Sequence, residues 1–102
     1  MTDRTAALER LLHTRPDDGR LRFGLALEYE RVGRIDDAVR AMEEYLSRSE
    51  DEGNGWGRLG AMWATLGRVE DARGAYRRGI AQAEKHGHPS LAEELRSTLD
   101  EL

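Results

Sequence analysis

The chain has 102 residues, a formal net charge of −4 at pH 7 and no cysteine. The lack of cysteine excludes disulfides, thiolate metal sites and cysteine nucleophiles, and the acidic balance does not favour nucleic-acid binding. Charged residues make up 35% of the sequence, but the apolar residues recur at helical spacing, which favours a folded helical protein over a disordered one.

The first predicted element is a helix within residues 1–18. Leu8, Leu11 and Leu12 follow helical spacing, and Pro16 with two aspartates behind it ends the segment. The N-terminus lacks the apolar core of a signal peptide, and no apolar run approaches the roughly 20 residues of a membrane-spanning helix. We therefore expect a cytoplasmic protein without membrane contact.

Residues 22–38 and 56–72 are similar to each other at an offset of 34 residues. The equivalent pairs are Leu25/Leu59, Ala26/Gly60, Tyr29/Trp63, Gly33/Gly67, Arg34/Arg68, Asp37/Asp71 and Ala38/Ala72. A period of this length is typical of solenoids built from helix–turn–helix units. We therefore expect one repeat over residues 19–52 and a second over residues 53–86.

Each repeat predicts two helices joined by a tight turn. Gly33 and Gly67 stand where the first helix of each repeat ends, because glycine readily adopts the left-handed backbone of a helix C-terminus. Acidic pairs at positions 36–37 and 70–71 then open the second helix, where the helix dipole favours negative charge.

Residues 87–102 predict a closing helix that starts at residues 89–90. Ser90 and Glu93 have the spacing of a capping box. Leucines line one face of this helix at Leu91, Leu95, Leu99 and Leu102. They fall two places late against the 34-residue register, so we expect the preceding loop, around residues 87–88, to be longer by about the same amount.

The second repeat resembles the signature W-x-x-L-G-x-x-Y of the tetratricopeptide repeat (TPR) family through Trp56, Leu59, Gly60 and Trp63. Ala72 and Tyr76 are similar to the A-x-x-x-F pattern of its second helix, whereas the first repeat has Arg22 in place of the tryptophan. The resemblance implies an all-α, TPR-like helix–turn–helix solenoid of about six helices. It implies a single domain with a right-handed superhelical stack, in which residues 1–18 form a half-repeat and residues 87–102 a capping helix.

The resemblance also implies a binding surface, because the first helix of each TPR lines a concave groove that holds an extended peptide or a partner helix. The predicted groove residues are Arg20, Phe23, Leu27, Glu30, Arg31, Asn54, Gly57, Arg58, Ala61, Ala64 and Thr65. The set is apolar at its centre and polar at its rim. We therefore expect an adaptor that binds a protein or peptide partner, without enzymatic activity or a cofactor.

Gly57 is unusual in this pattern, because a glycine within a helix costs about 1 kcal/mol relative to alanine. Gly60 occupies a position where the family signature has a small residue, but Gly57 has no packing role within its own repeat. It either leaves room for a partner's backbone or bulky side chain, or marks a weak start of the helix.

Self-association is the alternative function. The N-terminal helix lacks the helix that would pair with it, and the C-terminal row of leucines would leave apolar surface exposed. A second copy of the chain could cover either edge in a homodimer. The charge balance is −3 over residues 19–52 and +3 over residues 53–86. Such opposite ends attract each other or a charged partner.

The remaining motifs predict no further chemistry. His86 and His88 bring two imidazoles together without an adjacent acidic residue, which favours a polar loop over a metal site. The sequence has no serine–histidine–aspartate order, phosphate-binding glycine loop or metalloprotease motif, so we expect no catalytic residues. Fifteen arginines against one lysine favour a GC-rich genome and a bacterial source.

Overall fold

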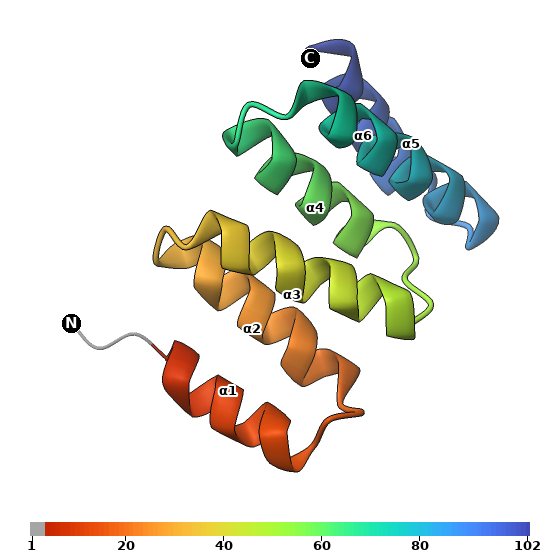
Figure 1. Cartoon of the computed structure of the whole chain (residues 1–102). Helices are drawn as coiled ribbons and strands as arrows, with labels where there is room; N and C mark the ends of the chain where they lie inside the picture. The colour runs from red at the N-terminus through yellow and green to blue at the C-terminus, as the bar shows by residue number, and fades with distance from the viewer. Residues whose placement is uncertain (1–3) are drawn as a thin grey trace. The chain divides into compact units, whose positions relative to one another are not determined.

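The computed structural model describes residues 4–102, and the chain forms two compact units that divide after Ser49. Six α-helices make up the regular structure of these residues, which contain no strand (Figure 1). The expectation of an all-α protein with about six helices is therefore confirmed. The single domain, the repeat boundaries and the right-handed superhelix stay predictions.

The first unit contains α1 (Thr5–Thr14), α2 (Gly19–Arg31) and α3 (Ile35–Arg48). The Asp18 carboxylate caps α2 by accepting a hydrogen bond from the Leu21 backbone N–H, with N and O 3.0 Å apart. Asp36 and Asp37 lie in the first turn of α3 as predicted. The α2 and α3 helices pack side by side, and α1 packs against α2 (Figure 1).

The second unit contains α4 (Asn54–Thr65), α5 (Val69–Lys85) and α6 (Pro89–Asp100). The N-cap residue of α4 is Gly53, and the Asp51 side chain before it supplies the acceptor: its Oδ2 accepts hydrogen bonds from the backbone N–H groups of Gly53 and Gly55, both at 2.9 Å. This carboxylate is buried, so its hydrogen bonds fix the start of α4. The α5 helix packs against both α4 and α6 (Figure 1).

Glycines end the first helix of each repeat, as the sequence predicts. Gly33 has φ +85° and Gly67 has φ +75°, a backbone conformation that favours glycine. The next N–H then turns back to the helix. The Arg34 N–H donates to the Tyr29 carbonyl oxygen at 2.8 Å, and the Arg68 N–H donates to that of Trp63 at 2.9 Å. These bonds satisfy carbonyl groups that the helix end leaves free.

Each unit has its own apolar core of small and large residues. In the first unit, the buried apolar residues are Leu25, Ala26, Tyr29, Ala38, Val39 and Met42. In the second, they are Leu59, Met62, Ala72, Ala75, Tyr76, Ala83, Ala92 and Leu95. Ala38 and Ala72 are completely buried, which agrees with a close approach of the paired helices.

Two expectations for the C-terminal helix are wrong. Helix α6 begins at Pro89, so its N-cap is His88, and no side-chain hydrogen bond caps this end. Ser90 therefore lies inside the helix and cannot form the predicted capping box. The loop before α6 is not lengthened either. Instead α5 has 17 residues against 14 in α3, because good helix formers occupy its last turn.

Candidate functional site

Four of the predicted groove residues lie together on α4. Asn54, Gly57, Arg58 and Ala61 line a cavity of about 380 Å³ in the second unit. The other wall of this cavity comes from α6, and Tyr76 of α5 lies between the two. We call the cavity the α4–α6 groove; its lining residues are Asn54, Gly57, Arg58, Ala61, Tyr76, Leu91, Glu94, Leu95 and Thr98.

The α6 wall of this groove was missed by sequence reasoning. Leu91, Glu94, Leu95 and Thr98 come from the segment that the sequence identifies only as a capping helix. The row of leucines was the available signal, since a helix with an apolar face must pack against another element. Leu91 and Asn54 also line a second cavity of about 480 Å³ around the start of α6.

Gly57 has a packing role that its own repeat does not reveal. A Cβ atom at this position would lie 2.7 Å from Cδ2 of Leu95. A Cβ at Gly79 of α5 would lie 2.9 Å from Cδ1 of the same leucine. Leu95 is 6% exposed, so the two glycines make room for it. The packing partner of Gly57 thus lies on α6, outside its own repeat, and neither of the two interpretations drawn from the sequence includes this contact.

Tyr76 contributes a polar group to an otherwise tightly packed position. Its ring lies against Gly60, where an added Cβ would be 2.9 Å from two of the ring carbons. The side chain is only 4% exposed, and burial raises the pKa of the Tyr76 hydroxyl. Within residues 4–102, no hydrogen bond involves this hydroxyl.

Two charged side chains line the α4–α6 groove, one from each of the two helices. Arg58 lies on the α4 wall and Glu94 on the α6 wall, and both are exposed. Among the described residues, neither side chain forms an ion pair. The groove therefore combines an apolar base with one free charge of each sign.

The last two predicted residues of α4 lie elsewhere. Ala64 packs against the cluster of Ala72, Tyr76 and Leu95. The Thr65 hydroxyl donates a hydrogen bond to the Ala61 carbonyl oxygen at 3.0 Å, so it is occupied by its own helix.

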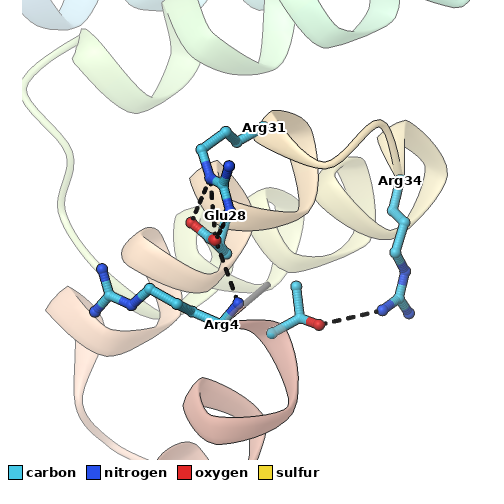
Figure 2. A network of polar contacts seen from close by, with 5 residues as sticks. Arg4, Glu28, Arg31 and Arg34 are labelled. Carbon is cyan, nitrogen blue, oxygen red and sulfur yellow. Dashed lines mark hydrogen bonds and ion pairs between the residues drawn. The ribbon is translucent and has the colours of Figure 1, made fainter. Parts of the chain in front are cut away.

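In the first unit, Arg31 is held by an unexpected partner, Glu28 (Figure 2). The Arg31 Nε–H lies 3.1 Å from both Glu28 carboxylate oxygens. This hydrogen bonding holds the pKa of Glu28 below its usual range. The Arg4 backbone N–H also donates to Glu28, at 3.4 Å. Arg31 thus helps to anchor the start of α1 through Glu28, which sequence reasoning missed.

The remaining predicted residues of α2 are less constrained. The Phe23 ring packs edge-on against Tyr45 of α3, with ring centroids 5.1 Å apart. Arg20 is exposed, whereas Leu27 and Glu30 are partly buried. The edge-to-face pair of Phe23 and Tyr45 adds packing energy and fixes the orientation of the Phe23 ring.

The fold gives the two histidines acidic neighbours that the sequence does not place beside them. The His88 Nε2 atom lies 2.5 Å from Glu52 Oε1, and the His86 Nε2 atom lies 3.4 Å from Glu50 Oε1. The hydrogen bond from His88 holds the pKa of Glu52 below its usual range. Over residues 4–102, however, no group of three or more histidine and carboxylate side chains is arranged to hold a metal ion.

The paired helices, together with the repeat of 34 residues in the sequence, are typical of a helical-repeat protein. The tetratricopeptide repeat family model matches residues 23–86, more than half of the 102 residues. This chain therefore belongs to the TPR family. Comparison with curated proteins gives no match. None of the helices within the described part of the chain is long and apolar enough to cross a membrane.

Solved TPR structures have the same fold. The crystal structure of PcrH in complex with the chaperone-binding region of PopD is 18% identical, with a TM-score of 0.88 over 96% of this chain and 74% of the PcrH chain. A MamA D159K mutant is 25% identical, with a TM-score of 0.64 over 96% of this chain and 65% of its own. Family and fold support a protein–protein interaction module, a class that is in general not enzymatic.

Proposed function

We propose that this protein is an adaptor that binds a peptide or partner helix along the first helices of its repeats, α2 and α4. The observation that supports this most directly is the α4–α6 groove. Four residues predicted to contact a partner line it: Asn54, Gly57, Arg58 and Ala61. Groove-lined helices that hold a peptide or helix are a recurrent recognition mode.

The chemistry of the groove suits an amphipathic segment. Ala61, Leu91 and Leu95 offer apolar surface, while Arg58 and Glu94 supply charge at the sides. Apolar anchors buried at the centre of an interface carry most of its binding energy, and polar residues at the rim set orientation. The proposed contacts from α2 are Arg20, Phe23, Leu27, Glu30 and Arg31, and those from the end of α4 are Ala64 and Thr65.

Selection from a displayed library of random peptides tests the proposal. The wild-type protein should enrich a family of related peptides. Ala61→Phe, which adds a ring to the groove wall, should abolish this enrichment. Ala81→Phe is the matched control, because it makes the same change at an exposed position of α5. The proposal fails if wild-type protein enriches no peptide family, or if the Ala61→Phe variant retains it.

Self-association is a second candidate function, supported by α1. This helix packs against α2, yet its Leu11 side chain is 44% exposed. The C-terminal edge gives less support than the sequence suggests, because Leu91, Leu99 and Leu102 pack against a cluster of buried residues that includes Tyr76. A homodimer would therefore be expected to form through α1.

Light scattering over a wide range of protein concentrations tests the homodimer. Self-association predicts a mass that rises with concentration for wild-type protein and a monomer mass for Leu11→Glu. A monomer mass of about 11.5 kDa at every concentration of wild-type protein would exclude the homodimer.

A further inference from the structure

The floor of the α4–α6 groove contains a polar group that the protein does not use. Tyr76 is buried and lines the groove, and its hydroxyl makes no hydrogen bond within the described part of the chain. The hydroxyl oxygen is not one of the enclosed side-chain atoms that lack a partner, which among residues 4–102 are Arg73 Nε and His86 Nε2, so it can be reached from the groove. The hydroxyl of the buried Tyr29, by contrast, donates to Glu9 at 2.8 Å. The Tyr76 hydroxyl is therefore available to a ligand in the groove.

The side walls carry charges that the protein does not neutralise. In the same unit, Arg68 pairs with Asp71 and Arg96 pairs with Glu84. Arg58 on α4 and Glu94 on α6 have no such partner among residues 4–102. A partner that covers the groove would remove water from both charges, so a matching charge on the partner is needed at each wall.

The same groove also has apolar surface on both of its walls. Leu95 fills the space above Gly57, and Leu91 and Ala61 extend the surface along the two walls. An apolar side chain placed there loses contact with water without meeting an uncompensated charge. The groove thus combines a positive side chain on α4, a negative side chain on α6, apolar surface on both helices and one hydroxyl.

We propose that the α4–α6 groove recognises a peptide segment in which one apolar side chain lies between an acidic residue, which pairs with Arg58, and a basic residue, which pairs with Glu94. The Tyr76 hydroxyl forms a hydrogen bond to a polar group of the same segment. This inference rests on the proposed adaptor function and states the chemistry of the partner.

Peptide selection on charge-reversed proteins tests the two flanking contacts. Wild-type protein should enrich peptides with one acidic and one basic residue around an apolar residue. Arg58→Glu should enrich peptides with two basic flanking residues, and Glu94→Arg should enrich peptides with two acidic ones. These outcomes do not depend on the direction in which a peptide lies. Arg77→Glu reverses an exposed charge on α5, and its selected peptides should match those of wild-type protein.

The Tyr76 contact is tested with the tightest wild-type peptide and Tyr76→Phe. The loss of one hydrogen bond should weaken binding about five- to tenfold, while the thermal midpoint of the free protein stays within error of wild type. A purely structural role for the hydroxyl would give the reverse result, a changed midpoint with unchanged affinity.

The outcomes separate this inference from the proposed function. If wild-type protein selects peptides and Ala61→Phe abolishes selection, but Arg58→Glu, Glu94→Arg and Tyr76→Phe change nothing, the adaptor function stands and the proposed partner chemistry is wrong. If no peptide is selected by wild-type protein, both are wrong. If Ala61→Phe instead disrupts a dimer seen by light scattering, the groove holds a second copy, and the inference is also overturned.

Discussion

The two end helices differ in what they bury against their neighbours, because the buried residue of α1 is Thr5 and those of α6 are Ala92 and Leu95. Helix α1 is held to the first repeat by polar contacts: Tyr29 donates to Glu9 at 2.8 Å, and Arg34 donates to Thr5 at 3.5 Å. Helix α6 has a polar contact as well, the ion pair of Arg96 with Glu84, but it adds apolar burial, with Ala92 completely buried and Leu95 6% exposed. Polar contacts at a surface contribute little net stability each, whereas buried apolar area contributes in proportion to its size.

The two repeats also differ in the chemistry of an equivalent buried position. Glu28 in α2 and Met62 in α4 are equivalent at the 34-residue offset, and both are buried. The charged residue requires Arg31 as a partner, whereas the methionine requires none. The difference shows that a TPR position can be buried with either chemistry.

Large side chains are also distributed differently within each repeat. The second repeat has Trp56 on its first helix and Gly79 on its second, where a Cβ would lie 3.2 Å from the Trp56 Cβ. At the equivalent positions the first repeat has Arg22 and Tyr45. The aromatic side chain of this pair of positions is therefore on the first helix in the second repeat and on the second helix in the first repeat. There the Tyr45 ring packs against Phe23. Cores tolerate such exchanges when total volume and pattern are kept.

Truncation of the central leucine of α6 should have the largest effect on stability. Leu95→Ala removes a buried side chain that fills the space above Gly57, and should lower the free energy of unfolding by about 2–5 kcal/mol. Leu11→Ala on α1 is the matched control, with an expected change within about 0.5 kcal/mol because its side chain is exposed. Urea denaturation measures both. Equal losses would contradict the contrast between the two end helices.

Gly57→Ala should have the next largest effect. The new Cβ would lie 2.7 Å from Leu95, so the leucine must shift, at an expected cost of about 1–3 kcal/mol from overpacking. Gly74→Ala serves as the control, because no atom lies within 4 Å of a Cβ added there. That change should stabilise its helix by up to about 1 kcal/mol. A stabilising Gly57→Ala would show that α6 does not pack against this glycine.

Removal of a tyrosine hydroxyl should have a smaller effect on stability, and this effect should differ between the two units. Tyr29→Phe loses the hydrogen bond to Glu9 and should destabilise the protein by about 1 kcal/mol. Tyr76→Phe removes a hydroxyl that makes no hydrogen bond within the described residues, so it should cost less than about 0.5 kcal/mol. Thermal unfolding of both variants gives the comparison, and a greater loss for Tyr76→Phe would reverse it.

As pH falls, helix α1 should lose its protection from hydrogen exchange before helix α6 does. Arg31 holds the folded-state pKa of Glu28 below its usual range. The stability from this carboxylate is therefore complete above its unfolded pKa, and is lost as pH falls through the folded value. Amide hydrogen exchange measured down a pH series should show α1 losing protection first. Arg31→Met, which removes the charge that favours ionised Glu28, should shift this loss to higher pH. Loss of protection in α6 first would contradict the assignment.

Much of the fold follows from local sequence signals. Gly33, Gly67 and the acidic pairs that follow them predict the helix ends because their backbone and dipole preferences act within a few residues. The capping box at Ser90 was wrong because Pro89 already occupies the first position of α6, which proline favours.

The candidate site was harder to predict, because it depends on contacts between helices far apart in the sequence. The contact of Gly57 with Leu95 joins α4 to α6, and no periodicity within one repeat identifies it. The burial of Glu28 and its contact with the backbone of Arg4 likewise depend on where α1 packs. Sequence patterns placed four α4 residues on the groove, but the row of leucines on α6 showed only that this helix must pack against another element, not that it forms the other wall.

The central claim is that a partner peptide occupies the α4–α6 groove, and amide chemical-shift mapping tests it most directly. Titration of isotopically labelled protein with the tightest selected peptide should shift the amide signals of the groove residues on both walls, including Ala61 of α4 and Leu91 of α6. Signals from the exposed face of α5 around Arg77 should not move. Shifts confined to α1 or to that face of α5 would contradict the account.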